Sequence, residues 1–156
     1  MKAILLALAF LLLANARPLC AADPVADDSK QLDGQWTPIA AVLGGMKIPP
    51  EELKKITLTL SGDSHEVVVV GEDHIDKGTS TRDTTTTPKR LTVKSLEGPN
   101  KGKTFLGIYE FKQVNGQDAY RVCYDLSGTA FPTEFKSVKG TQLYLAGYRR
   151  KKAAGP

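Results

Sequence analysis

Histidines and acids around one short segment are the first residues whose types could support chemistry. His65 and His74 flank a β-branched run, and both lie near acidic residues that could join them in binding a metal. In a hairpin that reverses at residues 71–73, however, the two histidines stand several positions apart along the ladder. We therefore expect both to be surface residues of a polar hairpin, and we predict no metal site.

Cys123 is the remaining nucleophile candidate in the chain downstream of residue 22. It lies between Val122 and Tyr124 on a predicted strand and cannot share their face, and a reactive thiol also needs a base and an activating field. The sequence contains no G-x-S-x-G, C-x-x-C or H-E-x-x-H pattern and no glycine-rich phosphate loop. We predict no catalytic residue, no cofactor and no enzymatic activity.

Aromatic and apolar residues at period-two spacing on adjacent predicted strands offer a third kind of chemistry, the binding of an apolar molecule. The same positions would equally make the packed core of a small barrel, so both interpretations remain open. The candidate interior positions are Phe105, Tyr109, Phe111, Tyr120, Val122 and Tyr124.

The elements that must position these residues are strands, because apolar and polar residues alternate along most of the chain from residue 34 onward. Asn115-Gly116 between two such runs is typical of a two-residue hairpin turn. The pattern predicts strands near 35–43, 56–61, 64–70, 75–82, 90–96, 104–113, 118–125 and 141–149. Short connections favour an all-β, up-and-down antiparallel barrel of about eight strands, although a sandwich has the same periodicity.

Two further segments depart from this alternation and differ from the strands in composition. Pro49–Lys55 predicts one short helix after the first strand, with proline in the first turn and acids before lysines along the dipole. It could cover one mouth of the barrel. The threonine-rich stretch 79–87 predicts an exposed strand that runs into a loop.

The N-terminus has the pattern of a secretory signal peptide: Lys2, then a charge-free apolar run too short to span a bilayer, then small residues. Cleavage fits after Ala16 or after Ala22, and we prefer Ala22. A signal peptidase that cleaves before a lipidated cysteine needs small residues at the preceding positions, and Leu19 is a poor choice there. We therefore do not expect a lipoprotein anchored at Cys20. The predicted organisation is a signal peptide at 1–22, one domain at 23–150 and a basic tail at 151–156, in a periplasmic or secreted protein.

The chain carries a net charge of +4, but its positive residues are unevenly placed. Lys2 and Arg17 belong to the predicted leader, and Arg149–Lys152 are all basic. The rest of the domain is slightly acidic, which offers no basic face for nucleic acid. The tail could touch an anionic surface weakly, but a solvated end fits it better.

Six short segments together resemble an uncharacterised lipocalin-like domain family that is abundant in exported proteins of planctomycete bacteria. They occur in the family's order over residues 30–150. These segments are Leu32–Trp36, Ile48–Leu53, Glu97–Thr104, Gly107–Glu110, Val122–Tyr124 and Pro132–Phe135. The resemblance implies a lipocalin-like barrel behind a signal peptide, and it implies no activity, because the family has no assigned ligand or reaction.

Gly34-Gln35-Trp36 also resembles the G-x-W signature at the first strand of true lipocalins. The resemblance implies that Gly34 and Trp36 close one end of the barrel under an arginine from the last strand. Arg149 is our candidate, and the adjacent Arg150 is the alternative. We expect a monomeric, exported binding module for a small apolar or amphipathic ligand. The alternative is an envelope interaction or structural module with a filled core.

Overall fold

The computed structural model describes residues 28–152, and nearly all of its regular structure is β. The predicted signal peptide, both cleavage points and Cys20 lie outside the described residues. The elements are α1 (Ser29–Leu32), β1 (Gly34–Leu43), β2 (Met46–Lys47), α2 (Pro50–Leu53), β3 (Ile56–Ser61), β4 (Ser64–Val69), β5 (Ile75–Asp83), β6 (Lys89–Glu97), β7 (Thr104–Val114), β8 (Gln117–Asp125) and β9 (Leu143–Arg150).

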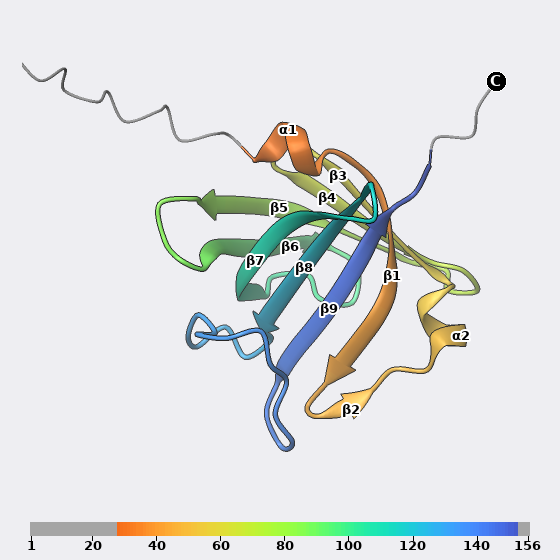
Figure 1. The fold of residues 1–156 in the computed structure, drawn as a ribbon. Coiled ribbons are helices and arrows are strands. Elements are labelled where there is room, and N and C mark those ends of the chain that lie inside the picture. Colours follow the sequence, from red (N-terminus) through yellow and green to blue (C-terminus); the bar gives the residue numbers. More distant parts are fainter. Residues whose placement is uncertain (1–27, 153–156) are drawn as a thin grey trace, which may run out of the picture.

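The sheet closes on itself. Strands β1 and β3 to β9 pair antiparallel in chain order, and β9 pairs back with β1 from Trp36–Arg150 to Leu43–Tyr144. The architecture is therefore a closed eight-stranded barrel with β2 as one extra strand at the end of β1, consistent with a lipocalin-like barrel (Figure 1). Closure decides between the barrel and the sandwich that the sequence left open, and it removes the sheet edges.

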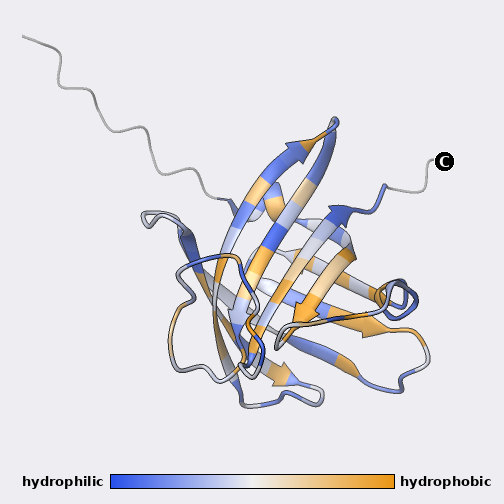
Figure 2. Cartoon of the chain, turned by 60° about the horizontal axis from the view of Figure 1, so that its bottom comes forward, coloured by the Kyte–Doolittle hydropathy of each residue, from blue (hydrophilic) through white to orange (hydrophobic). Residues whose placement is uncertain are grey.

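The strands form where the sequence alternates. Leu58 and Leu60 of β3 are buried while Thr57 and Thr59 face outward, and Figure 2 shows the same alternation of apolar and polar stretches along other strands. Asn115 and Gly116 join β7 to β8 with φ of 52° and 72°. A two-residue hairpin needs positive φ at both positions, so this turn sets the register of the pair.

The predicted helix is present but shorter, as α2, with Pro50 in its first turn. Its Leu53 is buried in the core, and α2 packs beside β1, where β1 and β3 have separated (Figure 1). The sequence reasoning missed α1 and β2. Both are too short for a periodic signal.

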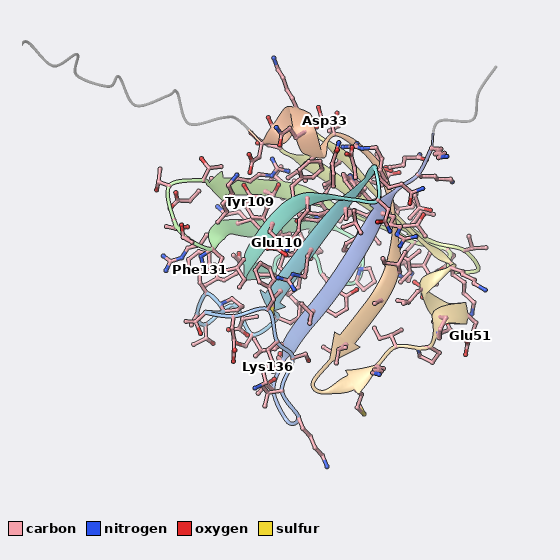
Figure 3. The ribbon with its side chains drawn as sticks, viewed as in Figure 1. Asp33, Glu51, Tyr109, Glu110, Phe131 and Lys136 are labelled. Atoms are coloured by element: carbon pink, nitrogen blue, oxygen red, sulfur yellow. The ribbon has the colours of Figure 1, made fainter. Side chains whose placement is uncertain are left out.

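Helix α1 and Trp36 close one end of the barrel. Trp36 is fully buried, and its indole N–H donates to Leu32 O at 2.8 Å. Asp28, also buried, accepts hydrogen bonds from Lys89 Nζ at 2.7 Å and from the Tyr109 hydroxyl at 3.0 Å. Figure 3 shows Asp33 beside α1 at this end, which we call the closed end.

The arginine over Trp36 is Arg150, so the choice of Arg149 was wrong. The Arg150 guanidinium lies 4.3 Å from the indole ring, and its Nε donates to Asp118 at 2.7 Å. The guanidinium also donates to the carbonyl oxygens of α1 and Asp33. Arg149 alternates to the outside and is exposed. A Cβ on Gly34 would come within 2.7 Å of Arg150 Nη1, so this position favours glycine.

A second buried cluster lies outside the barrel wall. Ile108 and Cys123 pair across β7 and β8 and are buried although they point outward, because the segment after β8 covers them. Cys123 Sγ donates to Lys136 O at 3.5 Å, and Arg121 stacks on Phe135 at 4.1 Å. Figure 3 shows Lys136 on this covering segment. Burial raises the pKa of the Cys123 thiol, which favours the protonated form over the nucleophilic thiolate.

Candidate functional site

A cavity of about 210 Å³ lies inside the barrel. Its end near Ile56, Asn100, Leu126 and Tyr144 is formed by partly exposed residues, and we call this end the mouth. The closed end lies opposite. The apolar side chains that line the cavity are Ile56, Leu58, Leu60, Val67, Leu91, Val93, Phe105 and Leu126.

Four tyrosines from β8 and β9 form one wall, which we call the tyrosine wall: Tyr120, Tyr124, Tyr144 and Tyr148. Tyr120 is paired with Tyr148 and Tyr124 with Tyr144 across the two strands, with ring centroids 5.8 and 6.5 Å apart. Burial raises the pKa of all four phenols. At neutral pH they are therefore uncharged groups that can donate or accept hydrogen bonds.

The wall across the cavity is polar. In the closed strand order β4 and β5 stand opposite β8 and β9, and the inward positions of β5 include Asp76, Ser80 and Arg82. Ser95 of β6 and His65 of β4 extend this polar wall on either side. Ser80 is buried, so the expectation of an exposed threonine-rich strand was wrong for the inward half of β5.

Arg82 is a buried cation in this wall. Its side chain is 8% exposed, and Nη1 donates to Gly62 O at 3.0 Å in the β3–β4 turn. The nearest carboxylate, Asp63, is 3.6 Å away, but its side chain is 81% exposed. Water screens that ion pair strongly, so it neutralises the guanidinium poorly.

His65 also faces the cavity, which corrects its assignment to the surface. Its Nδ1 is buried without a hydrogen-bond partner among the described residues. Burial is the main cause that lowers the pKa of His65. The negative charge of Asp76 raises this pKa, and the positive charge of Arg82 lowers it, so that the net shift is downward. The imidazole is therefore neutral at pH 7.

His74 is exposed, as expected, in the turn before β5. Its Nε2 lies 2.8 Å from Glu72. In the described part of the chain no three His, Cys, Asp or Glu residues are grouped so that they could hold a metal ion.

Asp76 has one oxygen satisfied and one free. Oδ2 accepts a hydrogen bond from Asn100 Nδ2 at 3.1 Å, while Oδ1 is buried and has no partner among residues 28–152. Asp76 is paired with Val67, two residues along the ladder from the His65–Gly78 pair, so it is a diagonal neighbour of His65.

The six predicted interior residues all face the barrel interior, but they divide between the cavity and the core. Phe105, Tyr120 and Tyr124 line the cavity. Tyr109, Phe111 and Val122 instead pack in the core with Trp36, whose ring centroid lies 6.3 Å from that of Phe111.

The sequence reasoning missed several cavity residues. Tyr144 and Tyr148 share a period of two that could have revealed them. Arg82, His65 and Asp76 carry no such signal, because both faces of their strands are rich in polar residues.

Comparison with protein-family models, with curated proteins and with solved structures gave no match. Among the described residues, no helix has the length and apolar character needed to cross a bilayer.

Proposed function

We propose that this protein is an exported binding module, lipocalin-like in fold, that holds one small amphipathic molecule inside its barrel and catalyses no reaction. The observation that carries the proposal is the cavity itself, with apolar side chains, a tyrosine wall and a facing polar wall. Such a mixture of apolar lining and a few polar groups is typical of small-molecule sites. The resemblance to the planctomycete family implies only a lipocalin-like barrel and adds no ligand or activity.

The cavity volume limits the size of the ligand. Pockets for drug-sized molecules begin near ~300 Å³. A cavity of about 150 Å³ accommodates benzene, so 210 Å³ in proportion holds about eight heavy atoms. A longer molecule would extend through the mouth. The same volume argues against the filled core of the alternative interaction module.

The protonation states of Arg82 and of the tyrosine wall suit binding better than general acid–base catalysis. An arginine is always charged, and the phenols of the tyrosine wall have pKa values raised by burial. General acid–base catalysis needs a group whose pKa lies near the working pH. Groups with fixed protonation states are better suited to holding a ligand.

Native mass spectrometry of the protein purified from the envelope or medium of its own cells tests the proposal. We expect one small molecule to co-purify with the wild type. It should be absent from Val93→Phe, which adds a ring where Val93 lines the cavity. Leu96→Phe is the matched control, because Leu96 is on the same strand and 54% exposed.

A wild-type protein that carries no molecule and binds none on addition would favour the interaction module. Export is tested on the same sample by N-terminal sequencing. We expect the chain to begin at Asp23; recovery of an intact N-terminus in the cytoplasm would contradict export.

A further inference from the structure

We propose that the ligand is a small monoanion, a carboxylate of about eight or nine heavy atoms, whose charged group binds Arg82 near the closed end of the barrel. This inference rests on the proposed binding function and names the chemistry of the ligand. It follows from how Arg82 is buried, what surrounds it and where the opposing charge lies.

Arg82 is a buried charge whose nearest carboxylate among the described residues, that of Asp63, is largely exposed. A guanidinium has five N–H donors, and within the described residues the hydrogen bond it donates goes to Gly62 O. Burying an ion without a matching partner is expensive, so buried charges in proteins are usually paired. A carboxylate fits the planar fork of an arginine and can accept two parallel hydrogen bonds from it.

The groups around Arg82 suit an anion. Ser80 is the inward residue two positions before Arg82 on β5, and its hydroxyl lies 3.5 Å from Asp63 O, to which it donates a long hydrogen bond. The positive charge of Arg82 lowers the pKa of the Tyr120 and Tyr124 phenols, although burial raises it by more. Neutral hydroxyls can donate to a bound carboxylate without adding a negative charge beside it.

The carboxylate that lines the cavity, Asp76, lies far from Arg82. Asp76 and Arg82 are six positions apart on the same strand, so their backbones are about 20 Å apart. Asp76 lies toward the mouth with Asn100, whereas Arg82 contacts the β3–β4 turn, whose Gly62 N–H donates to Asp33 Oδ1 at 2.7 Å. Among the residues that line the cavity, the carboxylate therefore lies toward the mouth and the guanidinium toward the closed end.

The apolar part of the ligand would then lie between the tyrosine wall and side chains such as Leu58 and Val93. Benzoate has nine heavy atoms, which is close to the size that the cavity volume allows. It therefore serves as the probe, and benzamide is a neutral molecule of almost the same shape.

Isothermal titration calorimetry of the mature chain with benzoate, benzamide and benzylammonium tests the inference. We expect benzoate to bind at least tenfold more tightly than benzamide, because charge-assisted hydrogen bonds are the stronger ones. Benzylammonium should bind more weakly than either. The preference should survive in 0.5 M NaCl, since a buried pair is screened much less than a surface pair.

Arg82→Met should abolish the preference for benzoate and leave benzamide binding unchanged. Arg90→Gln is the matched control and should keep the preference, because Arg90 is exposed on the outer face of the adjacent strand. The comparison of the two ligands on the wild type needs no variant, so a misfolded Arg82→Met would still leave the inference tested.

The outcomes separate the inference from the proposed function. Equal binding of benzoate and benzamide would overturn the anion inference and leave the binding function intact. Tightest binding of benzylammonium would overturn it in favour of Asp76 as the recognition group. If none of the three probes binds and no molecule co-purifies, the proposed function fails as well.

Discussion

The closed end of the barrel and its cavity treat buried polar groups in opposite ways. At the closed end the indole of Trp36, the carboxylate of Asp28 and the guanidinium of Arg150 each have partners. In the cavity His65 and Asp76 each keep a buried atom without a partner in the described chain. An unsatisfied buried group costs about 1–3 kcal/mol. The polar groups of the closed end therefore stabilise the fold, whereas those of the cavity lower its stability.

Trp36→Ala should have the largest effect on stability. It removes a fully buried indole together with its hydrogen bond and its stacking with Arg150. We expect a loss of about 3–5 kcal/mol in the free energy of unfolding, measured by urea denaturation. Trp36→Phe should lose less, because the ring is retained. A loss under about 1 kcal/mol for Trp36→Ala would show that this end can collapse around the missing ring.

Asp28→Ala should follow, with a loss of about 1–3 kcal/mol. The substitution removes the acceptor of the hydrogen bonds from Lys89 and Tyr109, and it loosens α1 at the closed end. Thermal and urea unfolding give the measurement. Asp27→Ala, at the neighbouring acidic position in the sequence, is the comparison variant. Equal losses for both would mean that the buried contacts of Asp28 contribute nothing specific.

Arg150→Gln and Arg149→Gln form a matched pair at the end of β9. Arg150 stacks on Trp36 and binds Asp118, whereas Arg149 is exposed. We expect Arg150→Gln to cost about 1–2 kcal/mol and Arg149→Gln to stay within about 0.5 kcal/mol of wild type. The reverse order in urea denaturation would restore Arg149 as the closing residue.

Acidification should weaken the cavity side through His65. Its folded pKa lies below the unfolded value of about 6.5, so the unfolded chain binds the proton more readily. Stability is therefore lost as the pH falls below about 6.5, until the folded pKa is reached. Between pH 7.5 and 5.5 the wild type should lose more unfolding free energy than His65→Gln. His74→Gln, at the exposed histidine, should follow the wild type.

Arg82→Met should cost little or no stability, and this result would sharpen the contrast with Arg150. Replacing a buried charge that has weak partners by an apolar side chain of similar length is often neutral or stabilising. We expect the free energy of unfolding to stay within about 1 kcal/mol of wild type or to rise. A loss as large as that of Trp36→Ala would mean that Arg82 is a structural residue.

Local patterns predicted the strands closely, because alternation and turn chemistry act over a few residues. The segment 56–61 matches β3, and 104–113 matches β7 to within one residue. The turn at Asn115-Gly116 set the pairing of β7 with β8 for the same reason. The helix predicted at 49–55 is confirmed in part, because only Pro50–Leu53 is helical.

The candidate site was less predictable, because a period of two shows which residues share a face but not which face is inside. On β5 the inward set of Asp76, Ser80 and Arg82 is as polar as the outward set, so no local signal separates them. On β9 the outward Leu145 is partly buried and pairs with the buried Cys123, so hydrophobicity does not separate the two faces of this strand.

The sequence by itself therefore determined an antiparallel β-meander, its main turns and the Gly34–Trp36 position that closes one end. Only the tertiary structure decided that the sheet closes into a barrel, that Arg150 covers Trp36, and that Arg82 and His65 point inward. The physical reason is distance along the chain. Propensity and periodicity act between neighbours, whereas burial depends on the pairing of β1 with β9, more than a hundred residues away.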